Sequence, residues 1–238
     1  MKRSSFTVVP AAVLSASLLS ATAVRAGQNK VPQAPATSAV QKLRDGLYRV
    51  GTITVDIAKK ELTVACSINS DVTTLEFVAN TRGGNKAYES ALTIDADAVS
   101  FNAALLLLGL DPSHARVPTR HFDPVAPKGD PLEISLDWQA ADGPHHAPIE
   151  RLLYDERSRA TLAEGPWVYT GSTFIDGRYL AALDGVLIGF VHSPSPVIEN
   201  PRPGAVDAYG SIVLNKDFVV ARGAALTLTI KALPVKKR

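Results

Sequence analysis

The alternation of apolar and polar positions along the chain is typical of a protein built mainly from β-strands. Short runs rich in β-branched and aromatic residues are separated by turn-forming Gly, Asn, Asp and Pro, which is the pattern of successive strands. In residues 179–191, Asp184-Gly185 stands between two apolar segments and predicts a hairpin with a type I′ turn. Residues 142–148 predict a break, and residues 149–158 a short helix. We therefore expect a mostly antiparallel sheet, whose other strands cover residues 48–57, 61–68, 74–80, 86–94, 131–138, 167–172, 211–215 and 225–233.

One segment has the pattern of a longer helix. Asp95 and Asp97 supply carboxylates suited to cap its N-terminus, and Gly109 and Pro112 follow its last turn. The residues between them, about 96–108, are apolar almost all the way round the helix, which predicts burial on more than one face. The expected fold class is therefore α+β: a mostly antiparallel β-sheet or partly closed barrel around one buried α-helix.

The first 26 residues have the features of an export signal. Lys2 and Arg3 form a positive start, an apolar stretch follows, and Val24-Arg25-Ala26 places small residues at the two positions that define a cleavage site. Pro10 and several Ser and Thr residues make the stretch weakly hydrophobic for a permanent span of about 20 residues. We expect residues 1–26 to be a cleaved bacterial signal peptide and the protein to be periplasmic or secreted, with no transmembrane segment after cleavage; an uncleaved anchor is the alternative.

The rest of the chain predicts one domain after a linker. Residues 27–42 are polar and contain two prolines, as is usual for a disordered linker. Residues 43–238 show no internal repeat and no shift in composition. With 46% hydrophobic residues, the chain has enough apolar material for a core. We therefore expect a single β-rich domain from residue 43 to residue 238.

Charge and cysteine content narrow the possible partners and cofactors. Removal of Lys2, Arg3 and Arg25 with the leader leaves 22 bases facing 23 acids, so no basic face for nucleic acid is expected. Cys66 is the only cysteine and cannot form an intrachain disulfide. We expect no nucleic-acid partner and no cofactor.

Several segments, in their order and spacing, resemble the YdjY-like domain family of bacterial proteins. They cover most of residues 45–215. The resemblance implies an exported or envelope-associated, β-rich domain around one buried helix. A ferredoxin-like label is sometimes attached to this family, but an iron–sulfur cluster normally needs four thiolates, or two thiolates and two imidazoles, and this chain has one cysteine. The matching segments are YESAL (88–92), AALLLLGL (103–110), LEISLDW (132–138), WVYTGS (167–172) and YLAALDGVLIGF (179–190).

Three residues are candidates for acid–base or nucleophilic chemistry. Glu89 and Ser90 lie in a segment that the resemblance includes, and neighbouring residues of a strand face opposite sides. A buried Glu89 with a raised pKa would suit a general base; a structural carboxylate bonded to nearby amides is the alternative. Ser172 follows Gly171, but the segment lacks the G-x-S-x-G turn of a serine hydrolase, which favours a turn residue.

Histidines and aromatic residues provide weaker candidates. His121 and Asp123, or His145 and His146, are residue types that bind zinc, but no H-E-x-x-H or comparable spacing is present. Aromatic residues with a polar group could line a groove for a ligand or pack in the core; these are Trp138, Trp167 and Tyr169.

These observations predict an exported protein of the bacterial envelope, most simply a non-catalytic binding or structural module. Its partner would be an unidentified ligand or another envelope protein. The alternative is a hydrolase or metal-dependent enzyme that uses Glu89 with loop histidines.

Overall fold

The computed structural model describes residues 40–202, 210–220 and 225–235. The predicted leader and most of the predicted linker lie outside these residues. The first strand begins at Val40, three residues before the predicted start of the domain. None of the helices in the described ranges has the length and apolarity needed to cross a bilayer.

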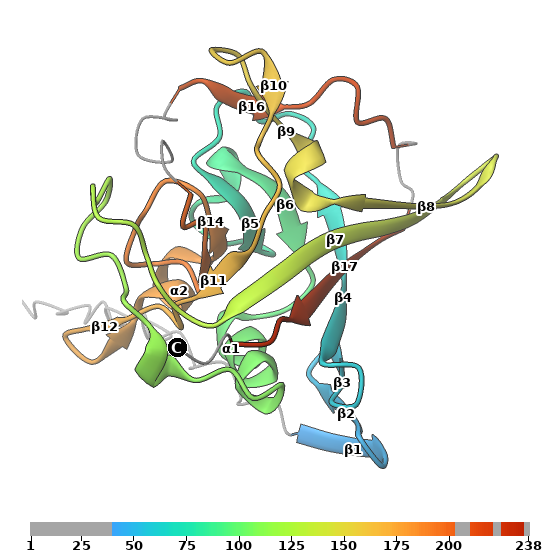
Figure 1. The fold of residues 1–238 in the computed structure, drawn as a ribbon, viewed down its shortest axis with the longest axis vertical. Coiled ribbons are helices and arrows are strands. Elements are labelled where there is room, and N and C mark those ends of the chain that lie inside the picture. The colour runs from blue at the N-terminus through green and yellow to red at the C-terminus, as the bar shows by residue number, and fades with distance from the viewer. Residues whose placement is uncertain (1–39, 203–209, 221–224, 236–238) are drawn as a thin grey trace, which may run out of the picture. The chain divides into compact units, whose positions relative to one another are not determined.

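Eight strands form a closed barrel (Figure 1). The ring runs β4-β17-β7-β11-β15-β14-β5-β6 and closes where β6 pairs with β4, for example at Cys66 opposite Ile94. The sequence predicts a sheet or partly closed barrel, and the structure shows the closed form. The barrel strands are β4 (Glu61–Ile68), β5 (Phe77–Thr81), β6 (Ser90–Ile94), β7 (Pro131–Ala140), β11 (Trp167–Tyr169), β14 (Val186–Gly189), β15 (Ile198–Glu199) and β17 (Leu226–Ala232).

The core lies inside this barrel because alternate side chains of each strand point to the same face. In β17, Leu226, Leu228 and Ile230 are buried and the intervening threonines are half-buried. Both neighbours of this strand, β4 and β7, pair with it antiparallel. The strands β5 and β14 are different, since nearly all of their residues are buried. Both faces of these two strands are therefore covered.

Further strands extend the barrel wall. The edge ribbon consists of β1 (Val40–Arg44), β2 (Leu47–Val50) and β3 (Ile53–Asp56) and continues the sheet from β4. Residues 142–148 do not break the sheet as predicted, because Gly143–Pro148 form β8 and pair with β7. The hairpin β7–β8 extends away from the barrel (Figure 1). Smaller sheets contain β9 (Leu153–Asp155), β10 (Ala160–Thr161) and β16 (Ile212–Leu214), and β12 (Phe174–Ile175) and β13 (Arg178–Tyr179).

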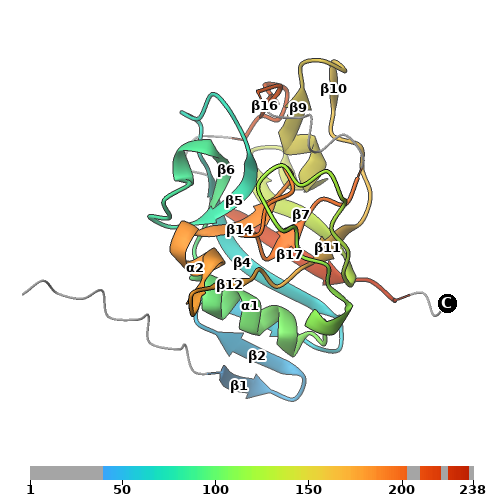
Figure 2. The same ribbon diagram turned by 90° about the vertical axis from the view of Figure 1, so that its left-hand side faces the viewer.

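Helix α1 (Ala98–Leu107) forms where the capping signals place it. The Asp97 carboxylate accepts a hydrogen bond from the Ser100 backbone N–H at 2.8 Å, and Gly109 has φ +92° after the last turn. The helix packs on β2, β3 and β14 and lies beside the barrel strands (Figures 1 and 2). It is buried on one side only, since Leu106 is 43% exposed. The structure therefore shows the expected barrel but does not show it wrapped around this helix.

A second helix replaces the hairpin predicted at Asp184-Gly185. Residues Leu180–Asp184 form α2, and Gly185 ends it with φ +78°. Glycine with a positive φ suits a helix C-terminus as well as a type I′ turn. The helix-forming Leu and Ala residues before it favour the helix. Short 3-10 turns also occur at η1 (Ala87–Glu89), η2 (Pro112–His114) and η3 (Ile149–Leu152), and only η3 remains of the helix predicted over 149–158.

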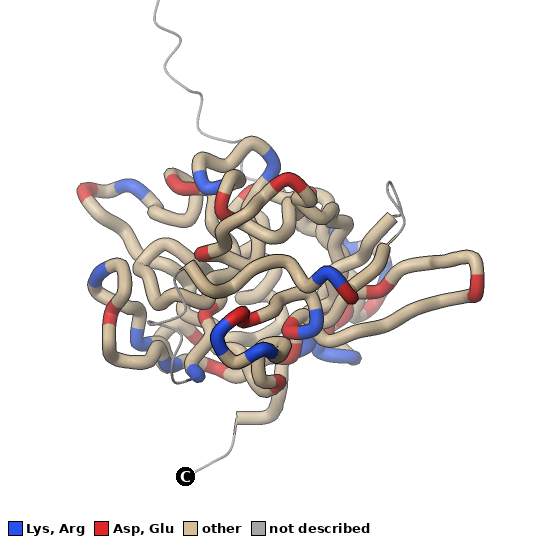
Figure 3. The backbone as a smooth tube through the Cα atoms, turned by 90° about the horizontal axis from the view of Figure 1, so that it is seen from above, with Lys and Arg blue, Asp and Glu red and all other residues tan. Residues whose placement is uncertain are grey.

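Two neighbouring pairs of barrel strands are parallel, β5 with β6 and β14 with β15. A parallel pair needs a connection that crosses from one end of the strands to the other. Residues 82–89 make the first crossover and residues 190–197 the second. Basic and acidic residues are interspersed along the described backbone (Figure 3).

Candidate functional site

The two crossovers and helix α2 meet at one cavity of about 280 Å³. Figure 2 shows α2 next to β14 and β5, the strands that the crossovers connect to their parallel neighbours. Residues far apart in the sequence thus come together because of the parallel strand pairs. The lining residues are Phe77, Lys86, His121, Leu180, Asp184, Ser193, Pro194 and Ser195.

Glu89 forms an ion pair with Lys86, which lines this cavity. The Glu89 carboxylate is buried, and its Oε1 lies 2.6 Å from Lys86 Nζ. Burial opposes the charge of Lys86, but the hydrogen bond and the charge of Glu89 outweigh it and raise the pKa of the lysine. Ser90 Oγ donates to the Lys86 carbonyl at 2.8 Å and closes the 3-10 turn. The two candidates therefore differ: Glu89 pairs with a side chain that lines the cavity, and Ser90 supports the backbone.

His121 reaches the same cavity from the loop before β7. Its Nε2 lies 3.2 Å from Oε2 of Glu76, a residue that sequence reasoning missed. Burial, with the charge of Glu89, raises the pKa of Glu76. Burial, with the charge of Lys86, lowers the pKa of His121. The imidazole is therefore held mainly neutral at pH 7 beside a coupled group of charges.

Most of the other lining residues come from the second crossover and α2. Ser195 Oγ donates to Oδ2 of Asp184, and Glu199 Oε1 accepts from the Ser193 backbone N–H at 2.8 Å. Glu199 is fully buried, and burial raises the pKa of its carboxyl to about 8. A Cβ on Gly189 would lie 2.5 Å from Cγ of Pro196, so this strand position has no room for a side chain. The crossover is therefore held closely against the barrel.

Ser172 connects these two lining segments and does not face a base. It has φ +63°. Its Oγ donates to the Pro194 carbonyl at 3.3 Å and accepts from the Ala181 backbone N–H at 3.2 Å. No histidine contacts its hydroxyl among the described residues. The hydroxyl joins helix α2 to the second crossover.

The zinc candidates are not brought together. Asp123 accepts hydrogen bonds from the backbone N–H groups of Thr119 and Val125, which lower its pKa to about 2. His145 pairs with Asp142 and His146 with Asp137, both on the β7–β8 hairpin. Within the described ranges, no group of three or more His, Cys, Asp or Glu residues is arranged to hold a metal ion.

The aromatic candidates also lie in separate places. Trp138 stacks on His145 on the hairpin, with ring centroids 5.2 Å apart. Trp167 is fully buried and donates from Nε1 to Glu150 at 2.9 Å. The Tyr169 hydroxyl donates to Oδ1 of Asn102 on α1 at 2.7 Å. The three rings do not line a common groove.

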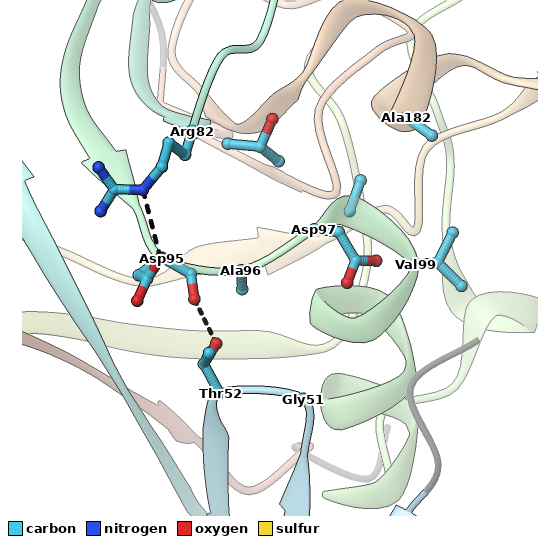
Figure 4. Close-up of a pocket in the computed structure, with 10 residues that line it drawn as sticks. Gly51, Thr52, Arg82, Asp95, Ala96, Asp97, Val99 and Ala182 are labelled. Carbon is cyan, nitrogen blue, oxygen red and sulfur yellow. Dashed lines mark hydrogen bonds and ion pairs between the residues drawn. The ribbon is translucent and has the colours of Figure 1, made fainter. Parts of the chain in front are cut away.

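Two larger hollows are weaker candidates for a functional site. One, of about 370 Å³, lies at the N-terminus of α1 (Figure 4). Its Arg82 is mostly exposed and contacts Asp95 at 3.4 Å, while Asp97 is used to cap the helix. The other, of about 400 Å³, contains four glutamates with Lys231 and His146. The cavity at the crossovers is smaller, but it gathers the coupled groups with shifted pKa values, so we treat it as the candidate site.

The fold is thus a closed β-barrel with two crossovers that border an open cavity. The model of the YdjY domain matches residues 53–231. The chain belongs to the YdjY domain family, as the order of its motifs predicts, and every residue that lines the cavity falls within the match. No curated protein and no solved structure matches the chain.

Proposed function

We propose that this protein is an exported, non-catalytic binding module of the bacterial envelope that holds a small ligand in the crossover cavity. One observation carries the proposal: four separate segments bring polar side chains to the cavity, and most of these are already held by internal partners. Lys86 is paired with Glu89, His121 with Glu76, and Asp184 with Ser195. Groups fixed before a ligand arrives lose little conformational freedom on binding.

A non-catalytic function is supported by the contacts of Ser172 and Glu89, the two catalytic candidates, because both are engaged by other groups. Ser172 Oγ is engaged by Pro194 and Ala181, and among the described residues no base that could activate it contacts it. Glu89 is engaged by Lys86. Export is supported by the leader features of residues 1–26.

The test is ligand retention. The purified protein is equilibrated with a small-molecule extract of bacterial cells, separated by gel filtration and denatured, and the released compounds are identified by mass spectrometry. We expect at least one compound to be retained by the wild type and lost in His121→Trp, which adds an indole at a cavity side chain that is 41% exposed. Ser67→Phe, on an exposed position of β4, is the matched control. No retained compound, or an unchanged set in His121→Trp at an unchanged melting temperature, would contradict the proposal.

A second candidate function is a hydrolase that uses Glu89 with a loop histidine. It is favoured by the neutral His121 held at 3.2 Å from Glu76 and influenced by the charge of Glu89. A neutral imidazole beside a carboxylate is suited to general-base catalysis. If this function holds, ester turnover by the wild type falls in both His121→Gln and Glu89→Gln, and turnover that survives in both variants excludes it.

A further inference from the structure

We propose that the crossover cavity recognises a small organic ammonium group, with Asp184 as its counter-ion. This inference rests on the proposed binding function and names the chemistry of the ligand. It is carried by the hydrogen-bonding groups that remain available in the cavity and by the balance of charges around it.

The first observation is an unused hydroxyl. Ser193 is 4% exposed and lines the cavity. Its Oγ has no hydrogen-bond partner among the described residues, whereas its backbone N–H is bound by Glu199. The hydroxyl oxygen is not itself fully buried, so it can be reached from the cavity. A group that enters the cavity would therefore satisfy it.

The other available groups are mainly acceptors. Ser195 gives its hydroxyl proton to Asp184, so its lone pairs remain to accept. His121 directs Nε2 toward Glu76; with the proton on Nε2, a neutral imidazole offers Nδ1 as an acceptor. The second carboxylate oxygen of Asp184 also accepts. An ammonium group has three N–H donors and no acceptor, so it matches this set, whereas a carboxylate or phosphate has only acceptors.

The charges around the cavity also favour a cationic ligand. Asp184 is half-buried, and no basic side chain pairs with it among the described residues. Lys86 is already paired with Glu89, and Glu76 faces a neutral imidazole. Of the charged side chains among the described residues that line the cavity, Lys86 is thus neutralised by Glu89 and Asp184 is not, which leaves an excess of negative charge. A ligand cation next to Asp184 would balance this excess, and an anion would increase it.

The volume of the cavity and its apolar walls limit the size and polarity of the rest of the ligand. A volume of about 280 Å³ corresponds to roughly nine groups of the size of a water molecule. Phe77, Leu180 and Pro194 provide apolar surface. The cavity therefore suits an amine on a short carbon skeleton.

The experiment compares n-butylamine, n-butanol and butyrate, which have similar sizes but carry a cation, a neutral hydroxyl and an anion. Binding to the purified protein at pH 7 is followed by NMR chemical-shift titration. We expect saturable binding of butylamine at millimolar concentration, weaker binding of butanol and none of butyrate. Asp184→Asn should weaken butylamine binding about tenfold or more, a loss of about 1.4 kcal/mol. Asp142→Asn, on the hairpin, is the matched control and should leave it unchanged.

The inference is overturned if butylamine does not saturate, if butanol or butyrate binds as tightly, or if Asp184→Asn has no effect while the fold is intact by melting temperature. Ser193→Ala provides a second variant and should weaken butylamine binding to a smaller extent than Asp184→Asn. A neutral or anionic compound retained from the cell extract would leave the binding function standing and overturn the ammonium assignment. If nothing is retained and no probe binds, both proposals fail.

Discussion

Two histidine–carboxylate pairs in this protein have similar contacts and different surroundings. His121 and Glu76 meet at the crossover cavity, with Nε2 and Oε2 3.2 Å apart. His146 and Asp137 meet on the β7–β8 hairpin, with Nδ1 and Oδ1 2.7 Å apart. The side chain of Glu76 is 9% exposed and that of Asp137 is 42% exposed. The comparison shows that the position in the fold, and not the pair of residue types, decides which pair belongs to a candidate site.

The two pairs differ physically because water reaches the carboxylate of the hairpin pair more easily than that of the cavity pair. Charges on the hairpin are screened by water and salt, so an exposed ion pair contributes about 0–1 kcal/mol. At the cavity, burial raises the pKa of Glu76 and lowers that of His121, and Lys86 and Glu89 act on both groups. A change at one member of this group therefore alters the others, and the same change on the hairpin does not.

The largest expected difference between the two regions is in packing. Phe77 is buried at the cavity, and Phe77→Ala should lower the free energy of unfolding by about 3–5 kcal/mol because it leaves an unfilled volume. Trp138→Ala on the hairpin should cost about 0.5–1.5 kcal/mol, the value of its aromatic contacts. Urea denaturation of both variants makes the comparison. Equal losses would show that the hairpin is as much a part of the core as the cavity wall.

The next effect concerns Glu199, which holds the cavity wall through Ser193. In the unfolded chain its carboxyl loses the proton near its ordinary pKa of 4.5, whereas in the fold it keeps the proton until about pH 8. The unfolded state therefore binds fewer protons in this interval, and stability should fall as pH rises from about 4.5 to about 8, by at most about 5 kcal/mol. Thermal unfolding across this range is the measurement. Glu199→Gln should flatten the profile, and the exposed Glu164→Gln should not; a profile unchanged by Glu199→Gln would disprove the assignment.

A smaller effect is expected on the titration of His121. Its pKa should lie below the ordinary value because of burial and the charge of Lys86. Lys86→Met removes that positive charge and leaves Glu89 without its partner, so the pKa of His121 should rise. NMR titration of the imidazole protons measures it. Lys231→Met, on the barrel wall near His146, serves as the control, and a pKa of His121 that rises equally in both variants would contradict the proposed coupling.

The smallest effect is expected on the hairpin. The variant His146→Gln removes an exposed histidine–carboxylate pair and no aromatic contact among the described residues. The free energy of unfolding should change by less than about 0.5 kcal/mol. A loss several times larger, measured by urea denaturation, would mean that the hairpin pair is not screened as the comparison assumes.

Local patterns in the sequence predict the strands and α1 well, because their signals are short-range. The Asp97 cap and Gly109 lie within one turn of the helix that they bound. Asp184-Gly185 is ambiguous for the same reason: a positive φ at Gly185 fits both a hairpin and a helix end, and only the surrounding packing decides.

The candidate site depends on long-range contacts, and the sequence predicts only part of it. The sequence predicts Glu89 and His121 separately, each as a candidate functional residue. Glu76, the partner of His121, and the lining residues Asp184 and Ser193 have no local signal, since the two crossovers bring them together. An antiparallel expectation contains no crossovers, so it does not predict this cavity.

The position of β17 has a consequence for how the molecule is made. The last strand of the described chain is inserted between β4 and β7 and pairs with both along most of its length. Until residues 226–232 leave the ribosome, β4 and β7 have no common neighbour and the ring of strands is open. In a nascent chain the ring of strands therefore stays open until residues 226–232 are available to pair with both strands.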